Sequence, residues 1–354
     1  MKVVSIVGAR PQLIKVTPVS KALREAGHQE ILVHTGQHYD YGMSKVFFEE
    51  LGISEPDTNL GVSSGHHGWQ TDQMLIRIEE VLLAENPDWV LVYGDTNSTL
   101  AGALAAVKLH IPLAHVEAGL RSFNREMPEE YNRVLTDHCS DLLFCPIQTA
   151  VNNLRREGIT QEVYLVGDVM YDSLLHNVKL TEERSHILER FELKPKSYAL
   201  ATVHRPENTD NHERLKSIFR ALEGITQDGV PVIVPLHPRT RKHLEALGSS
   251  LNSLKLIDSV SYLEMLLLEK QAQVILTDSG GVQKEAYWFG VPCVTLRDET
   301  EWVDTVESGW NVLAGTEAAQ IMKAVKQAQP GSKLHNAYGD GQAAERIVNL
   351  FSSV

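Results

Sequence analysis

Cysteine is scarce in this 354-residue chain. Its three cysteines, Cys139, Cys145 and Cys293, are scattered and form no CxxC pair. An odd, dispersed set of this kind provides neither a disulfide framework nor a cysteine zinc site. We therefore expect the protein to work in a reducing compartment.

Basic charge is also in short supply. The chain has 33 lysines and arginines against 46 aspartates and glutamates, which gives a formal net charge of −13. So acidic a chain is a poor partner for nucleic acid or for an anionic membrane surface. A small anionic ligand is not excluded, because a local cluster of basic residues decides whether such a ligand binds.

Long apolar runs are missing as well. The opening run, residues 2–8, is followed directly by Arg10 and Pro11. It is therefore too short for a signal peptide or for a membrane span, which needs about 20 residues. No later stretch approaches that length, and we expect a cytoplasmic protein with no membrane partner.

The common cofactor motifs are absent too. The chain contains neither GxGxxG nor the P-loop pattern GxxxxGKS/T, so the sequence supports neither a dinucleotide site nor a P-loop. His34, His38, His66 and His67 match no HExxH or paired-ligand spacing. We expect no catalytic metal and no cofactor.

What the chain does have is a series of short apolar, β-branched runs that alternate with longer amphipathic segments. In the first half the runs lie at residues 3–8, 30–36, 89–95, 113–119, 142–145 and 163–168, and in the second half at 198–204, 230–237, 255–260, 273–281, 291–296 and 311–315. Runs that are apolar throughout are typical of parallel strands covered by helices on both faces. The pattern predicts an α/β protein made of two Rossmann-like, doubly wound parallel-sheet domains.

The series pauses once, and this pause sets the predicted domain boundaries. Residues 170–197 are polar, charged and helix-forming, which is typical of a connection between domains. We expect an N-terminal domain over 1–170, a C-terminal domain over 171–335, and a final helix within 336–354 that packs back on the first domain. Two such domains facing each other would create a cleft at the carboxyl ends of their strands, where ligands of open α/β sheets bind.

Three acids follow the predicted strands of the first domain. Asp95 and Glu117 come at the ends of two apolar runs, and Glu129 follows Pro128 at a helix start. Each has an ordinary structural explanation, because Asp95 could cap the next helix and Glu117 could pair with Arg121. Acids are also favoured in the first turn of any helix, which explains Glu129 equally well.

Phosphate sites are suggested in both domains. Arg10 and Lys15 surround the turn between the first strand and its helix, which suits a phosphate or is simply a solvated turn. In the second domain His204 and Arg205 follow the first strand, where they could hold a diphosphate and move a proton, or form a surface loop.

The most specific single motif follows a later strand of the second domain. Ser279, Gly280 and Gly281 open a helix there, and small residues let the backbone N–H groups approach a phosphate. Glu285 lies about one helical turn further on, where a carboxylate could accept hydrogen bonds from ribose hydroxyls.

Taken together, these motifs resemble the non-hydrolysing UDP-N-acetylglucosamine 2-epimerases. The resemblance runs through nearly the whole chain and rests on GARPQLIK (8–15), HTGQHYD (34–40), GDTNSTLAGALAA (94–106), HVEAGLRS (115–122), MPEEYNR (127–133), HRPEN (204–208), PLHPRT (235–240) and DSGGVQKEA (278–286). It implies the glycosyltransferase-B architecture and the interconversion of UDP-GlcNAc and UDP-ManNAc, through elimination and re-addition of UDP. It also implies a cytoplasmic homodimer.

The resemblance assigns roles to the residues singled out above. The implied catalytic residues are Asp95, Glu117, Glu129 and His204. The implied contacts to the UDP-sugar come from Arg10, Lys15, Arg205, Tyr262, Ser279, Gly280, Gly281 and Glu285. In this scheme the acids remove and return the proton on C2 of the sugar, and His204 assists the departing diphosphate.

Several positions depart from the family pattern. Many members have arginine where this chain has Trp302, glutamate where it has Lys284, and asparagine where it has Asp168. These variants also resemble a branch that epimerises UDP-2,3-diacetamido-2,3-dideoxyglucuronate, so this sugar stays an alternative substrate. His38 is followed by Tyr39, unlike the segment with which some members bind a second, activating UDP-GlcNAc. A glycosyltransferase of the same fold and a non-catalytic sensor are further alternatives.

Overall fold

The structure, a computed structural model, describes residues 1–36, 52, 55–246, 251–332 and 337–351. The side chains of Arg10, Glu183, Arg184, Pro238 and Arg239 lie outside this description. So does the segment around His38 and Tyr39 that the sequence compares with an activator site.

The chain divides into two compact units. Unit 1 combines Met1–His176 with Asn336–Val354, and unit 2 is Asn177–His335. The division falls inside helix α7 (Val169–Arg184), whereas the sequence predicts it at residue 170. The boundary between the units therefore lies within a continuous helix, in the polar segment that the sequence predicts to be helical, and not in a loop.

The described part of unit 1 is built on a seven-stranded sheet in the order β3-β2-β1-β4-β5-β6-β7. Its strands are β1 (Lys2–Val7), β2 (Gln29–His34), β3 (Thr58–Asn59), β4 (Trp89–Tyr93), β5 (Leu113–Val116), β6 (Leu142–Cys145) and β7 (Val163–Leu165). All neighbouring pairs are parallel. Every residue of β4, β5 and β6 is buried, as expected for strands covered on both faces.

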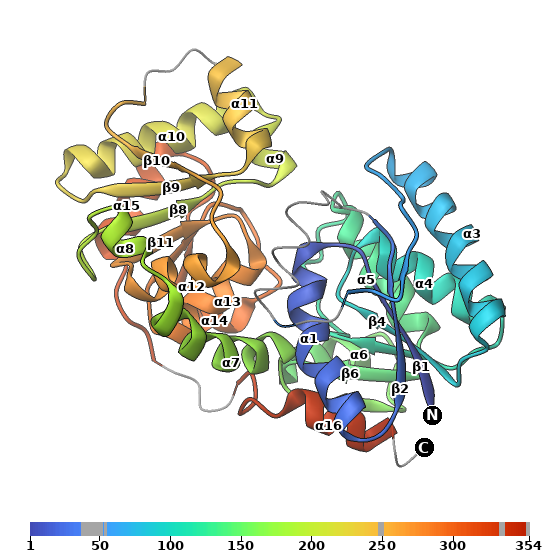
Figure 1. The fold of residues 1–354 in the computed structure, drawn as a ribbon. Helices are drawn as coiled ribbons and strands as arrows, with labels where there is room; N and C mark the ends of the chain where they lie inside the picture. Colours follow the sequence, from blue (N-terminus) through green and yellow to red (C-terminus); the bar gives the residue numbers. More distant parts are fainter. Residues whose placement is uncertain (37–51, 53–54, 247–250, 333–336, 352–354) are drawn as a thin grey trace. The chain divides into compact units, whose positions relative to one another are not determined.

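Helices cover both faces of this sheet (Figure 1). They are α1 (Arg10–Glu25), α3 (His67–Glu85), α4 (Asn97–Lys108), α5 (Pro128–Cys139), α6 (Gln148–Arg156), the first part of α7, and α16 (Ala343–Phe351). One face packs on α3 and α4 through a core that includes Val4, Val92 and Met74. On the other, α16 lies against α1, and its Phe351 ring packs edge-on 5.3 Å from Trp89.

Unit 2 repeats the same topology with six described strands in the order β10-β9-β8-β11-β12-β13. Its strands are β8 (Ala199–Thr202), β9 (Val232–Leu236), β10 (Lys255–Asp258), β11 (Val274–Thr277), β12 (Cys293–Thr295) and β13 (Asn311–Leu313). All neighbouring pairs are again parallel. Its helices are α8 (Ile187–Arg190), α9 (Pro206–Thr209), α10 (His212–Gln227), α11 (Pro238–Ala246), α12 (Tyr262–Gln271), α13 (Gly280–Phe289), α14 (Val303–Glu307) and α15 (Ala318–Gln327).

Two apolar cores fill the space on either side of this second sheet. One joins the sheet to α10 and α15, for example through Phe219 and Ile321. The other joins it to α8, α12 and α13, for example through Leu268 and Ala286. Both units are thus doubly wound Rossmann-like domains, which is the glycosyltransferase-B-like architecture that the sequence predicts.

Each sheet has one point at which the strand order reverses. In unit 1 this point lies between β1 and β4, and in unit 2 between β8 and β11. Ligands of such sheets bind beyond the carboxyl ends of the strands at this switch point. Within the described residues, the structure contains no helix that is both long and apolar enough to span a membrane.

Candidate functional site

The turn after β1 lies at the switch point of unit 1 and is tightly packed. A Cβ atom at Gly8 would overlap the hydroxyl oxygens of Ser98 and Thr35. The side chain of Gln12 accepts hydrogen bonds from the amides of Gly8 at 2.8 Å and Ala9 at 3.0 Å. These two amides are therefore occupied within the protein, and the predicted phosphate contact of this turn rests on Arg10 and Lys15 alone.

Glu117 forms a buried ion pair with Lys15, and the structure overturns the pairing with Arg121 that its sequence position suggests. The backbone of Glu117 has φ = 77°, which costs about 1–3 kcal/mol for a residue with a side chain and is commonest at functional sites. Arg121 instead contacts Asp137 and Glu157, each at 2.7 Å. Lys15 of helix α1, and not the nearby Arg121, thus supplies a cation beside Glu117.

Asp95 is not the cap of helix α4. That position belongs to Thr96, whose hydroxyl accepts a hydrogen bond from the amide of Thr99. The Asp95 carboxylate, with 31% of its side chain exposed, accepts from Nη2 of Arg133 at 2.6 Å and from Nε at 3.0 Å. Asn132 also donates to the Asp95 carbonyl at 2.9 Å, so helix α5 fixes both the backbone and the side chain of this acid.

The start of α5 gives two neighbouring glutamates different environments. Glu130 is buried and accepts from the amides of Ser122 and Phe123, both at 2.9 Å, and from Arg133 at 2.7 Å. Burial by itself raises the pKa of Glu130, but these hydrogen bonds and the Arg133 charge outweigh it and hold the pKa below its usual value. Glu129 is partly exposed, and its carboxylate makes no hydrogen bond or ion pair with another described residue.

The three predicted acids of unit 1 converge on one region. Asp95 and Glu117 follow neighbouring strands, because Tyr93 of β4 is paired with Val116 of β5. A Cβ atom at Gly94 would lie 3.2 Å from Oε2 of Glu117. Glu129 lies one helical turn before Arg133, which holds Asp95, so residues four apart place it on the same side of α5.

At the switch point of unit 2, a buried aspartate organises the loop that carries His204. Asp278 accepts hydrogen bonds from the amides of His204 and Arg205, each at 3.1 Å, and from Asn208 at 3.0 Å. Its Oδ1 also lies 3.2 Å from Nδ1 of the His204 ring, whose side chain is 48% exposed. The second ring nitrogen stays available for proton transfer, so this histidine is more than an untethered surface residue.

The first turn of α13 is close to two bulky side chains. A Cβ atom at Gly280 would lie 2.7 Å from Oε1 of Glu301 and 2.9 Å from Nε1 of Trp302. Ser279 caps the helix, and the first amides of any helix have no partner within it. Arg205 lies 3.8 Å from Glu301 and offsets the negative charge of this carboxylate beside the helix start. The amides of the first turn suit an anion.

Glu285 lies on the next turn and is held from helix α12. The hydroxyl of Tyr262 donates to Oε1 of Glu285 at 3.0 Å. Burial and the neighbouring charge of Glu285 raise the pKa of Glu269, a fully buried residue of α12, well above its usual value. Glu269 is therefore neutral beside Glu285, an arrangement that the sequence does not reveal.

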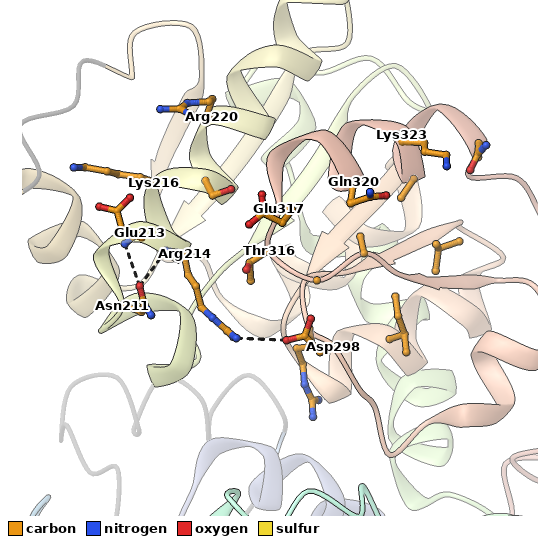
Figure 2. A pocket seen from close by; sticks show the side chains of 18 residues that line it. Asn211, Glu213, Arg214, Lys216, Arg220, Asp298, Thr316, Glu317, Gln320 and Lys323 are labelled. Carbon is orange, nitrogen blue, oxygen red and sulfur yellow. Dashed lines mark hydrogen bonds and ion pairs between the residues drawn. The ribbon is translucent and has the colours of Figure 1, made fainter.

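Unit 2 also contains an open groove of about 930 Å³ between α10 and α15. Figure 2 shows side chains of both signs along it, including Arg214, Glu317 and Lys323, with Arg214 paired to Asp298 at 3.4 Å. None of the predicted site residues lines this groove. Its volume alone therefore does not indicate where the chemistry takes place.

Known proteins share this chain's sequence and fold. The sequence profile of the UDP-N-acetylglucosamine 2-epimerase family matches residues 21–352. A UDP-N-acetylglucosamine 2-epimerase homolog of Methanococcus maripaludis is 54% identical, with 100% of both chains covered. The UDP-2,3-diacetamido-2,3-dideoxy-D-glucuronate 2-epimerase of Pseudomonas aeruginosa is 50% identical, also with 100% of both chains covered.

The chain belongs to the UDP-N-acetylglucosamine 2-epimerase family. The crystal structure of the Methanocaldococcus jannaschii UDP-GlcNAc 2-epimerase, in complex with UDP-GlcNAc and UDP, matches it with a TM-score of 0.95 and 47% identity over 100% of both chains. The family resemblance predicted from the sequence motifs is thus confirmed. Within the described residues, no cluster of His, Cys, Asp and Glu side chains could hold a metal ion.

Proposed function

We propose that the chain is a UDP-N-acetylglucosamine 2-epimerase that interconverts UDP-GlcNAc and UDP-ManNAc for cell-surface polysaccharide synthesis. One observation carries the proposal: three carboxylates surround the switch point of one Rossmann-like unit, while the other unit has a histidine and an anion-binding helix start at its own switch point. An epimerase that eliminates UDP needs both sets of groups. Family membership supports the same reaction.

The proton on C2 of the sugar is the chemical difficulty. It is not next to a carbonyl group, so it becomes acidic only as the bond from C1 to the diphosphate oxygen breaks. In the proposed reaction a carboxylate removes this proton and the C2–H electron pair forms the C1=C2 double bond. The C1–O electron pair leaves with UDP, and a 2-acetamidoglucal is the intermediate. Protonation of C2 on the opposite face and re-addition of UDP to C1 give the epimer.

Asp95, Glu117 and Glu129 are the proposed groups for removal and return of this proton. Asp95 and Glu117 are held by Arg133 and Lys15, and Glu129 lies free of such contacts within the described part of the chain. Two of the acids are thus restrained by cations and the third is not, and the proposed reaction needs acids in different roles, a base on one face of the sugar and an acid on the other. The ion pair also leaves Lys15 beside the reacting carboxylate, where it balances charge.

Unit 2 supplies the proposed leaving-group site. The amides of Gly280 and Gly281 and the Ser279 hydroxyl would bind the diphosphate, with Arg205 as a cation. Arg10 of unit 1 stays a proposed phosphate contact on the family resemblance alone. His204, tied to buried Asp278, would protonate or stabilise the departing oxygen.

The nucleoside would bind further along helix α13. Glu285 would accept hydrogen bonds from the ribose hydroxyls while Tyr262 holds its carboxylate in place. We further propose that the enzyme acts in the cytoplasm as a homodimer, as the family resemblance implies.

A second candidate substrate is UDP-2,3-diacetamido-2,3-dideoxyglucuronate. The relative that acts on this sugar covers the whole chain at 50% identity. In addition, the buried ammonium of Lys284 lies on helix α13, where many family members have a glutamate. An extra positive charge favours a sugar that carries a carboxylate.

Hydrogen exchange at C2 tests the proposal. We expect the enzyme, incubated in heavy water with UDP-GlcNAc, to place deuterium at C2 and to release UDP with a glycal that can be trapped. The same incubation with the diacetamidoglucuronate compares the two sugars directly. If no candidate UDP-sugar acquires deuterium at C2, the proposal is wrong; transfer to an added acceptor would instead indicate a glycosyltransferase.

A further inference from the structure

His115 is a fully buried histidine in strand β5, with two short hydrogen bonds. Its Nδ1 lies 2.7 Å from Oδ1 of Asp137, and its Nε2 lies 2.7 Å from the carbonyl oxygen of Gly94. Neither His115 nor Asp137 exposes any of its side chain to solvent. The two bonds use both ring nitrogens, and the pair is closed off from bulk solvent.

Both partners of the imidazole ring are hydrogen-bond acceptors. A backbone carbonyl has no proton to donate. Oδ2 of Asp137 already accepts from Arg121 at 2.7 Å and from the amide of Gly119 at 3.1 Å. Both donors to Oδ2, one of them a guanidinium, favour the ionised form of this buried carboxylate. The carboxylate is therefore ionised, and each nitrogen of the ring must carry a proton.

These contacts place His115 between the turns that hold two proposed catalytic acids. Gly94, whose carbonyl accepts from the ring, immediately precedes Asp95. Glu117 follows His115 by two residues, and Asp137 holds the next part of that turn through the Gly119 amide. Loss of the His115 ring would thus remove contacts that hold the turn at Gly94 and the turn at Gly119.

We propose that His115 is a buried imidazolium that fixes the Asp95 and Glu117 turns, through Gly94 and Asp137, and thereby acts as a positioning residue for proton transfer at C2. This proposal rests on the proposed function. His115 itself touches no reacting atom. Its charge is matched by Asp137, and Arg121 on the same carboxylate is matched in turn by Glu157 at 2.7 Å.

The groups that face this pair come from several elements. Asp137 lies on α5, Arg121 in the loop after β5, and the Gly94 carbonyl in the turn after β4. Cys145 on β6 is also close to Asp137, and burial raises the pKa of its thiol far above the usual range, so it stays uncharged. Within the described residues, Asp137 is thus the one anion available to His115 itself.

Nitrogen NMR tests the charge of the ring directly. In protein labelled with ¹⁵N-histidine, a two-bond proton–nitrogen spectrum distinguishes an imidazolium from either neutral tautomer. We assign the His115 signal by its loss in His115→Gln, and His176→Gln, which removes an exposed histidine of the same unit, serves as the control. Because both ring nitrogens face acceptors, we expect the imidazolium pattern for His115. A neutral pattern for His115 at about pH 7.5 would overturn the proposal.

Kinetics test the positioning role separately. Glutamine cannot donate to Asp137 and Gly94 from opposite ends, so His115→Gln should lower kcat about 100-fold, the scale expected for a displaced catalytic group. UDP binding, measured by calorimetry, should stay unchanged because the proposed contacts of helix α13 with the ribose and the diphosphate lie in unit 2. Loss of UDP binding together with kcat would show a general folding defect and contradict the positioning role.

The two proposals can fail independently. If the wild-type enzyme exchanges no C2 proton in any UDP-sugar, the proposed function is wrong, while the NMR result still reports the charge of His115. If wild-type exchange is normal and His115→Gln retains full kcat, the positioning role alone is wrong.

Discussion

The ammonium nitrogen of Lys284 lies 4.0 Å from the centroid of the Trp302 indole ring. Both side chains are buried, and the same nitrogen lies 5.6 Å from the ring of Trp288. These are two of the positions at which the chain departs from the family pattern, and the structure shows that they are in contact. Many family members have a glutamate at the position of Lys284 and an arginine at the position of Trp302. This chain instead has a lysine and an uncharged indole ring. Helix α13 therefore gains positive charge near its start.

Removing Trp302 should expose the cost of burying Lys284. Trp302→Ala should lower the Tm strongly, because loss of a large buried aromatic costs about 3–5 kcal/mol. A desolvated cation–π contact contributes about 2 kcal/mol of this. Lys284→Met should therefore lower the Tm of the wild type, but leave the Tm unchanged or raise it in the Trp302→Ala background. The four proteins of this double-mutant cycle are compared by thermal unfolding, and equal effects of Lys284→Met in both backgrounds would rule out the coupling.

The neutral form of Glu269 predicts a specific pH dependence. Its raised pKa means that the folded state keeps a proton that the unfolded chain releases above about pH 4.3. Stability therefore falls as pH rises from that value towards the folded-state pKa. Glu269→Gln, which is always neutral, should raise the Tm at pH 7 and leave it unchanged near pH 4. A gain in Tm of the same size at both pH values would contradict this account.

The helix start that we propose for the diphosphate predicts an intolerant glycine. Gly280→Ala places a methyl group within 3.0 Å of Glu301 and Trp302, so the turn must shift. We expect UDP affinity, measured by calorimetry, to fall by at least about tenfold. Gly68→Ala is the matched control, because this helical glycine has no neighbouring atom within 4 Å. UDP binding that survives Gly280→Ala unchanged would place the diphosphate elsewhere.

The fold could be predicted from the sequence because its strands are apolar on both faces. In β1, for example, residues 3–7 are all buried and mostly apolar, which is typical of a parallel strand covered on both faces. Asp95 and Glu117 became candidate acids for a related reason, because a carboxylate at the end of an apolar run is conspicuous in the sequence. The boundary between the units was predicted less well, because helix α7 continues through it without any break in composition.

The partners of these acids could not be predicted in the same way. Sequence proximity favoured Arg121 for Glu117, yet the left-handed backbone at Glu117 turns the carboxylate towards Lys15 of α1. His115 and Asp137 lie on different elements, and a histidine within an apolar strand gives no sign of its partner. Such pairs depend on how helices pack on the sheet, which local patterns do not encode.

The adjacent residues Glu129 and Glu130 provide a matched test of function against stability. Glu130→Gln removes the charge that accepts two amides and Arg133, so the Tm should fall at neutral pH. Because the pKa of Glu130 is lowered in the folded state, this stabilisation is present above about pH 4.3 and is lost as pH falls through the folded-state pKa. The Tm difference between Glu130→Gln and wild type should therefore shrink at acid pH.

Glu129→Gln should behave in the opposite way. Its carboxylate forms no hydrogen bond or ion pair with another described residue, so the Tm should stay within about 1 °C of wild type. Deuterium exchange at C2 should fall by at least about 100-fold, the scale of a general acid–base contribution. Thermal unfolding and C2 exchange, measured on both variants, show which of the two glutamates serves stability and which serves proton transfer. If Glu129→Gln exchanges normally, Glu129 is an ordinary acid of a helix start, and the proton at C2 is handled by Asp95 and Glu117 alone.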